Sequence, residues 1–257
     1  MKTILWIVSL LLVICGCTPK PTEVVSPDGH IRLQFALDDH NRMTYRIDVD
    51  DTAFVAPSAL GFLAGKGVNL SEGMKVVGTE FSAADETWTQ PWGENKSIRN
   101  HYNEMAVCLS DEADTKLTLR FRVFDDGVGF RYEYEVAGVD SIFVTDELTS
   151  FNMAQDGISW SIPANYETYE LLYRTQPLSK TDNANTPMTF KVGKTYASIH
   201  EAALTDFPEM TFQNTGGCGF KSELAPWPDG IKAKIEGGSF NTPWRTVQIP
   251  QLSKLSV

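Results

Sequence analysis

Alternation of apolar and polar residues with a period of two is the feature that most constrains the fold of this chain. It is clearest in Ile31–Leu37, Met43–Val49, Leu117–Val123 and Phe130–Val136. A period of two places every second side chain on one face of an extended strand, so each segment predicts a strand with one buried and one exposed face. The turn-forming sequence Asp125-Asp126-Gly127 separates the last two segments, which are therefore expected to form a hairpin.

Much of the remaining chain follows the same pattern. Shorter strand-like runs lie near Lys75–Phe81, Ile142–Thr145, Ile158–Ile162, Thr189–Val192, Tyr196–Leu204 and Arg245–Ile249. No segment has sustained helical periodicity with capping residues at both ends, and the strand–helix alternation of a TIM barrel is not seen. The sequence therefore predicts an all-β fold, a large antiparallel sandwich of many short strands.

The beginning of the chain has the character of an export signal. Lys2 precedes an apolar run, Ile4–Ile14, that is too short to remain across a bilayer. Cys15, a glycine and Cys17 follow, which is typical of a lipoprotein signal peptide over residues 1–17 and makes Cys17 the expected lipidation site; an ordinary signal peptide cleaved nearby is the alternative. We expect residues 18–25 to form a tether and residues 26–257 to form one β domain, in a periplasmic protein anchored to the outer membrane.

Composition narrows the possible partners. The chain has 22 Lys+Arg and 33 Asp+Glu, a formal net charge of -11. Nucleic acids and anionic membrane surfaces are bound through basic patches, so neither is expected, and membrane contact is expected through the lipid anchor alone. An acidic chain suits neutral ligands such as sugars, or a divalent cation. For Cys108 and Cys218, a disulfide and two free thiols both fit the sequence.

A first group of polar and aromatic residues follows the run at Lys75–Phe81. It occupies Glu86–Glu94 and Ile98–Glu104, and its candidate sugar-binding residues are Trp88, Trp92, Glu94, Arg99 and Asn100. Tryptophan faces stack on sugar rings, while neighbouring polar groups bind the hydroxyls. Considered by themselves, these residues favour a different interpretation, an aromatic-rich loop that packs over a sheet edge or a neighbouring domain.

Two further segments carry carboxylates. Glu167 and Glu170 lie in the loop that follows a predicted strand, and carboxylate oxygens are calcium donors, although two glutamates are too few for a complete site. The dipeptide His200-Glu201 is expected on a strand, where neighbouring side chains point to opposite faces, so the two groups are not expected to act on one atom. The histidine is therefore expected to have a structural role. No G-x-S-x-G or H-E-x-x-H motif occurs.

Taken together and in order, several segments resemble the N-terminal domain of glycoside hydrolase family 97. The matching segments are Ser26–Gly29, Glu86–Glu94, Ile98–Glu104, Phe121–Glu133, His200–Leu204 and Asn241–Arg245. This family comprises calcium-dependent α-glucosidases and α-galactosidases. The resemblance implies a galactose-mutarotase-like super-sandwich, which in complete members precedes a catalytic (β/α)₈ barrel and a small C-terminal β domain.

The resemblance also implies that the two domains contribute different residues to the active site. The catalytic carboxylates and most calcium ligands of the family lie on the barrel, and this sequence ends at Val257 before one, so no catalytic residue is assigned and the chain alone is expected to be inactive. The family's N-terminal domain packs on the barrel and contributes one glutamate to the calcium site. That glutamate corresponds to Glu170, with Glu167 as the alternative if the loop register shifts.

The function that the resemblance implies is thus a supporting domain of an enzyme that acts on α-linked oligosaccharides. Retention or inversion would depend on the carboxylate spacing in the barrel. A free-standing carbohydrate-binding lipoprotein without catalysis is the alternative. A mutarotase-type epimerase is a third possibility, and it would require His200 and Glu201 to converge on a sugar ring.

Overall fold

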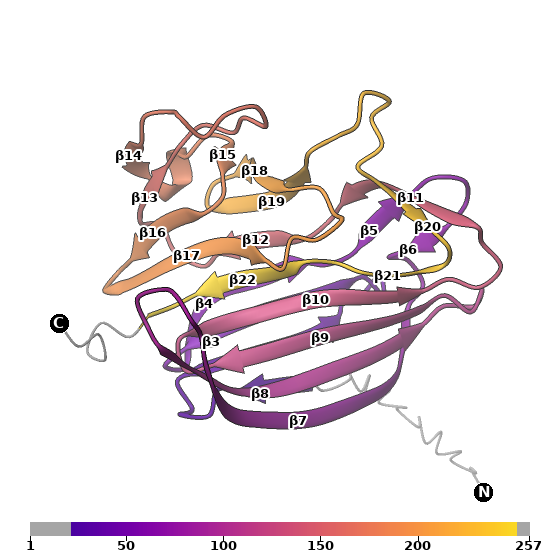
Figure 1. The fold of residues 1–257 in the computed structure, drawn as a ribbon, viewed down its shortest axis with the longest axis horizontal. Helices are drawn as coiled ribbons and strands as arrows, with labels where there is room; N and C mark the ends of the chain where they lie inside the picture. The colour runs from indigo at the N-terminus through magenta and orange to yellow at the C-terminus, as the bar shows by residue number, and fades with distance from the viewer. Residues whose placement is uncertain (1–21, 251–257) are drawn as a thin grey trace, which may run out of the picture.

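The computed structural model describes residues 22–250, and the predicted lipidation site, Cys17, lies outside the described residues. Within residues 22–250 all regular secondary structure is β-strand, apart from one 3-10 turn, η1 (Leu178–Lys180). All strand pairs in this part are antiparallel (Figure 1), so the predicted all-β fold class is confirmed. No helix in the described part is long and apolar enough to cross a membrane.

Three sheets make up the domain. The eight-stranded sheet has the order β1 (Thr22–Val25), β2 (Ile31–Leu37), β3 (Met43–Val49), β4 (Thr52–Ala59), β12 (Ser150–Met153), β19 (Gly219–Leu224), β18 (Met210–Gly216), β15 (Ala184–Asn185). The ten-stranded sheet has the order β14 (Arg174–Pro177), β13 (Ile158–Ser161), β16 (Met188–Val192), β17 (Thr195–Ala202), β22 (Trp244–Gln248), β10 (Gly127–Glu135), β9 (Lys116–Phe124), β8 (Ser97–Ser110), β7 (Lys75–Thr89), with β21 (Ser239–Asn241) also paired to β10. A small sheet contains β20 (Ala233–Glu236), β11 (Ser141–Glu147), β5 (Phe62–Ala64) and β6 (Asn69–Leu70).

The hydrophobic core lies between the two large sheets. In Figure 1 the strands β7 to β10 face the viewer, with β3 and β4 behind them. Aromatic contacts cross this interface, with ring centroids 6.1 Å apart for Phe35 and Phe121 and 5.0 Å apart for Tyr45 and Phe130. These residues occupy the apolar positions of the four alternating segments, so the period-two pattern identified the core-facing side of each strand correctly.

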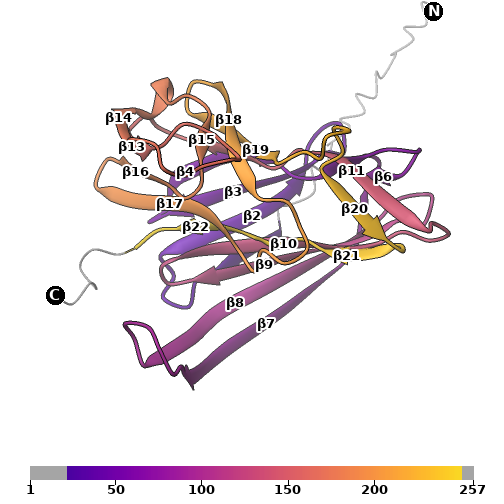
Figure 2. The same ribbon diagram turned by 45° about the horizontal axis from the view of Figure 1, so that its top comes forward.

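The hairpin formed by β7 and β8 is longer than the sequence predicts. Its pairing runs from Lys75 opposite Ser110 to Thr89 opposite Ser97, so Glu86–Thr89 and Ile98–Glu104, interpreted above as an aromatic-rich loop, are strand. Figure 2 shows this hairpin projecting past the rest of the molecule. Neither face of its outer part is covered by a second sheet, and the alternation that reveals a half-buried strand is therefore missing there.

The two cysteines of the described residues are free thiols. Cys108 lies on β8 in the ten-stranded sheet, whereas Cys218 lies in the turn between β18 and β19 of the eight-stranded sheet. Of the two alternatives left open by the sequence, the structure therefore has the free thiols.

Candidate functional site

The loop that follows β13 is ordered by its own hydrogen bonds. The side-chain oxygen of Asn165 accepts hydrogen bonds from the backbone N–H groups of Glu167, at 2.7 Å, and Thr168, at 3.2 Å. The backbone N–H of Glu170 donates to the hydroxyl of Thr168 at 3.0 Å. Asparagine and threonine stabilise turns in this way, and here they fix the backbone up to Glu170.

Two tyrosines attach this loop to the body of the domain. The Tyr166 hydroxyl lies 3.3 Å from the backbone carbonyl oxygens of both Glu223 and Leu224. The Tyr169 hydroxyl donates to Glu209 Oε2 at 2.6 Å. Burial, together with the adjacent Glu209 carboxylate, raises the pKa of the Tyr169 phenol above its ordinary value, so the group stays protonated and acts as a donor at neutral pH.

The same loop exposes two carboxylates and two large apolar side chains to solvent. The carboxylates of Glu167 and Glu170 are exposed and have no hydrogen bond or ion pair with any described residue. Leu172 and Tyr173, which follow, are 90% and 68% exposed. No group of three or more His, Cys, Asp or Glu side chains in residues 22–250 is placed to hold a metal ion. The loop can therefore supply part of a calcium coordination sphere, and the other oxygens would have to come from outside this domain.

The candidate sugar-binding residues of the β7–β8 hairpin lie on different surfaces. Trp88 is paired with Ile98 and Asn100 with Glu86, whereas Arg99 is paired with Thr87. Because side chains alternate along a strand, Trp88 and Asn100 share one face and Arg99 lies on the other.

Two of these polar side chains also have partners within the hairpin. Arg99 forms a two-pronged ion pair with Asp85 at 2.7 and 2.8 Å, and Asn100 donates to Glu86 at 2.8 Å. Trp92, which is 82% exposed, and Glu94 lie in the turn at the hairpin tip. The structure therefore does not gather the five residues into one platform, and sugar binding by them stays a prediction.

His200 and Glu201 lie on opposite faces of β17, as expected for neighbours on a strand. His200 Nδ1 is 3.2 Å from the Thr186 hydroxyl, and burial lowers the pKa of the imidazole. Glu201 points into the domain interior. The two side chains do not converge, so the epimerase hypothesis has no support in the geometry.

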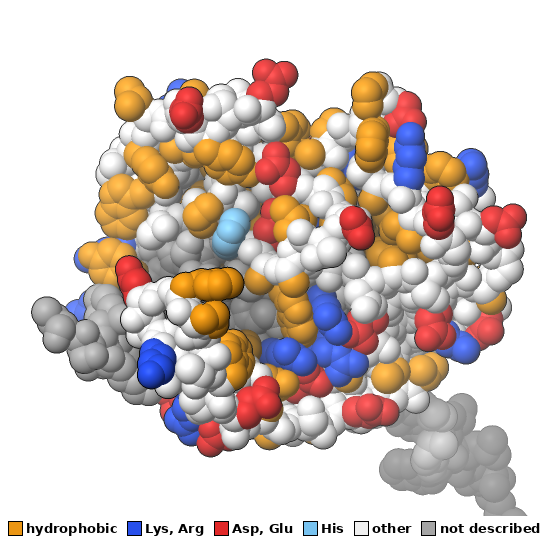
Figure 3. Space-filling model, viewed as in Figure 1, with side chains coloured by type: hydrophobic (Ala, Val, Ile, Leu, Met, Phe, Trp, Pro, Cys, Tyr) orange, Lys and Arg blue, Asp and Glu red, His pale blue; other side chains and the backbone are white. Residues whose placement is uncertain are grey.

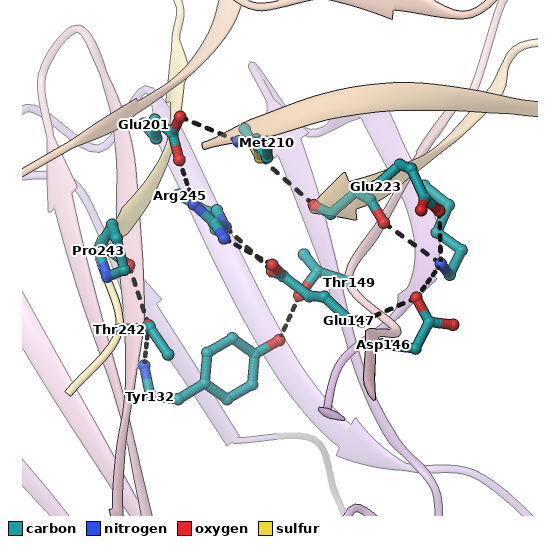
Figure 4. A network of polar contacts seen from close by, with 12 residues as sticks. Tyr132, Asp146, Glu147, Thr149, Glu201, Met210, Glu223, Thr242, Pro243 and Arg245 are labelled. Carbon is teal, nitrogen blue, oxygen red and sulfur yellow. Dashed lines mark hydrogen bonds and ion pairs between the residues drawn. The ribbon is translucent and has the colours of Figure 1, made fainter. Parts of the chain in front are cut away.

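A buried ion cluster, which the sequence analysis did not find, holds β22 inside the fold (Figure 4). Arg245 is fully buried and binds Glu147 on β11 through Nε, at 2.9 Å, and Nη2, at 2.5 Å. Its Nη1 donates to Glu201 on β17 at 2.7 Å. Burial raises the pKa of Glu201, opposed by the attraction of Arg245. We call Glu147, Glu201 and Arg245 the buried triad.

A second cluster of charged side chains, which includes two arginines, lies on the outer face of the ten-stranded sheet, away from the core. The guanidinium groups of Arg122 and Arg131 lie 4.7 and 4.8 Å from the ring centroid of Trp244. The carboxylate of Glu104 forms an ion pair with Arg122, and that of Glu133 forms one with Arg131. Figure 3 shows Lys and Arg side chains gathered at the hollow in this face. The Trp244-Arg245 pair thus belongs to two clusters, with Trp244 on the outer face and Arg245 in the core.

In a comparison with known proteins, one family model matches nearly the whole chain. The family model described as "Glycosyl-hydrolase 97 N-terminal" matches residues 24–256. A glycoside hydrolase family 97 enzyme from Pseudoalteromonas sp. strain K8, solved in complex with panose, is 35% identical to this chain. The two structures superimpose with a TM-score of 0.84, over 89% of this chain and 35% of that one.

Two more distantly similar proteins match a comparable share of this chain. A crystal structure of a β-arabinopyranosidase matches with a TM-score of 0.80 at 20% identity, which shows likeness of fold, over 89% of this chain and 40% of that one. A probable retaining alpha-galactosidase of Streptomyces bingchenggensis (strain BCW-1) is 23% identical over 239 residues, 92% of this chain and 36% of that protein. The chain therefore spans 35% to 40% of the length of these relatives.

Proposed function

This chain belongs to the glycosyl-hydrolase 97 N-terminal family, and we propose that it supports the catalytic domain of an α-glycosidase and supplies one ligand, Glu170, to its calcium ion. The observation that carries the proposal is the loop after β13, which is ordered internally yet exposes Glu170, Leu172 and Tyr173. The relatives of known structure or assigned activity are glycoside hydrolases about three times as long. An α-linked oligosaccharide as substrate is in keeping with the panose complex of one relative.

The physical state of the loop suits docking on a second domain. Ordering a flexible loop at an interface reduces binding affinity, and a loop already fixed by Asn165, Thr168 and Tyr169 avoids most of that loss. Burying the side chain of Leu172 against a partner would contribute about 2 kcal/mol. The exposed apolar side chains and the unpaired carboxylates are thus explained together if another domain covers them.

The chemistry of calcium assigns the remaining ligands to that second domain. Calcium takes about six to eight oxygen ligands, of which Glu170 provides at most two. Glu170 would add a negatively charged donor and would link ion binding to the relative placement of the two domains. We place the enzyme in the periplasm, attached to the outer membrane through a lipid on Cys17, in keeping with the signal-like segment at the start of the sequence.

Replacing Glu170 tests this role in an enzyme assembled by joining residue 250 of this chain to the remainder of the Pseudoalteromonas enzyme, here called the joined enzyme. We expect Glu170→Gln to raise the calcium concentration for half-maximal hydrolysis of p-nitrophenyl α-glucoside or α-galactoside by about tenfold or more, because a charged ligand is lost. Glu167→Gln, three residues away in the same loop, is the matched control and should change this concentration less than twofold. A raised calcium requirement confined to Glu167→Gln would assign the ligand to Glu167, and an unchanged requirement in both variants would refute the calcium role of this loop.

A further inference from the structure

We propose that Tyr169 is a positioning residue for Glu170, because its hydrogen bond to Glu209 fixes the half of the loop that bears the calcium ligand. The relevance of this contact to calcium rests on the proposed function. The ordering of the loop by Tyr169 does not rest on it and can be tested separately.

The loop has two anchoring regions, and Tyr169 is the anchor nearest to Glu170. The first half is attached through Asn165, whose backbone N–H donates to Asn185 Oδ1 at 2.8 Å, and through the hydroxyl of Tyr166. In the second half, which bears Glu170, the bond from Tyr169 to Glu209 is the side-chain contact among the described residues that ties the loop to the body of the domain. A hydrogen bond of 2.6 Å to a carboxylate is of the charge-assisted class, roughly twice as strong as a bond between neutral groups.

Glu209 is a firm anchor because its neighbours are tied to the core. Its backbone carbonyl accepts a hydrogen bond from the N–H of Ala225 at 3.0 Å. The next residue, Met210, donates its backbone N–H to Glu201 Oε1 at 3.1 Å. Glu201 in turn belongs to the buried triad, and Figure 4 shows this connection from Met210 through Glu201 to Arg245. A continuous series of contacts therefore joins the exposed loop to the most buried charges of the domain.

Tyr173 provides a matched comparison within the same segment. It is the same residue type, lies three positions after Glu170 and is 68% exposed, with no hydrogen bond to another described residue. Removing its hydroxyl therefore controls for the general effect of a tyrosine-to-phenylalanine change near the loop. The difference between the two variants isolates the contact with Glu209.

The first test measures amide hydrogen exchange in the isolated chain. Tyr169→Phe retains the ring and removes the donor, so we expect the amides of Glu167, Thr168 and Glu170 to exchange at least tenfold faster, with exchange of the core strands unchanged. Glu209→Ala, which removes the acceptor, should reproduce the effect, and Tyr173→Phe should not. Unchanged exchange in the loop of Tyr169→Phe would overturn the proposal.

The second test connects this ordering to calcium in the joined enzyme. Residues that orient a metal ligand typically change metal affinity by 10–100-fold when they are removed. We expect Tyr169→Phe to raise the half-saturating calcium concentration about tenfold, while the rate at saturating calcium stays within about twofold of the rate of the unsubstituted joined enzyme. General destabilisation would not produce this combination. A loosened loop with an unchanged calcium requirement would overturn the link between Tyr169 and calcium and leave the ordering of the loop by Tyr169 standing, whereas Glu170→Gln decides the calcium role of Glu170 itself.

Discussion

Replacing Arg245 with methionine is expected to lower the free energy of unfolding by about 3–5 kcal/mol, because it leaves two buried carboxylates without a cation. Arg245 and Glu147 are both inaccessible to solvent, and Glu201 is nearly so. Methionine retains most of the length and apolar contact of the arginine stem, so the loss reports mainly on electrostatics. Urea denaturation of the isolated chain, followed by tryptophan fluorescence, measures the change.

A surface ion pair of the same chemistry provides the control. Arg99 on the β7–β8 hairpin also forms a two-pronged pair with a carboxylate, Asp85, but its side chain is 58% exposed. Exposed pairs are screened by water and contribute little, so Arg99→Met should leave the denaturation midpoint nearly unchanged. Equal effects of Arg245→Met and Arg99→Met would contradict the importance assigned to the buried triad.

The triad also predicts a direction of pH dependence. One arginine serves two carboxylates, and burial raises the pKa of Glu201 above its ordinary value. The folded chain then retains a proton on Glu201 at a pH where the unfolded chain has released it, so this group's contribution to stability declines as pH rises from the ordinary pKa through the raised one. Glu201→Gln should remove that decline and destabilise the chain less than Arg245→Met at neutral pH. Parallel pH profiles of the free energy of unfolding for the original chain and Glu201→Gln would contradict this assignment.

The substitution Gly157→Ala is the second change expected to have a large effect, a loss of about 3 kcal/mol or more. A Cβ atom at this position would lie 2.0 Å from the backbone oxygen of Lys191 and 3.1 Å from Cγ2 of Val192. The obstructing atom is backbone in the adjacent strand β16, and it cannot rotate away as a side chain can. The Gly157 carbonyl also accepts a hydrogen bond from the N–H of Leu178 at 2.9 Å, so a shift of this residue disturbs both neighbours.

Gly78→Ala on β7 is the matched control for Gly157→Ala. The nearest atom to a Cβ at Gly78 is Cβ of Cys108, at 4.0 Å, which is ordinary contact. We expect this variant to unfold at nearly the same urea concentration as the original chain. Because Gly157 lies directly before β13, which leads into the Glu170 loop, Gly157→Ala should also increase amide exchange in that loop. A Gly157→Ala chain as stable as Gly78→Ala would show that β13 and β16 are not packed as closely as described.

The strands that sequence predicts well are those with one face against the core. Ile31–Leu37 matches β2 residue for residue, because each apolar position faces the opposite sheet. The outer half of the β7–β8 hairpin has no such face, and its polar and aromatic residues therefore lacked the pattern that marks a strand. Strand β4 was missed for a related reason, since its polar and apolar residues do not alternate strictly and Pro57 interrupts the run.

The functional features were predictable to different degrees. The resemblance assigned Glu170, and the residues themselves placed it correctly in the loop after a strand. The buried triad joins residues 98 and 44 positions apart, and the Tyr169–Glu209 contact joins residues 40 apart. No local pattern records such contacts, because they are created only when the sheets pack. The division of Trp88 and Arg99 between two faces likewise follows from the pairing register of the hairpin.

A calorimetric titration of the isolated chain with calcium tests most directly whether this domain holds only part of a shared site. With Glu170 as a single ligand and no cluster of metal-binding side chains in residues 22–250, we expect no stoichiometric binding with a Kd below about 1 mM. The joined enzyme should bind one calcium ion much more tightly and lose that affinity in Glu170→Gln. Stoichiometric binding of calcium by the isolated chain in the micromolar range would contradict the account.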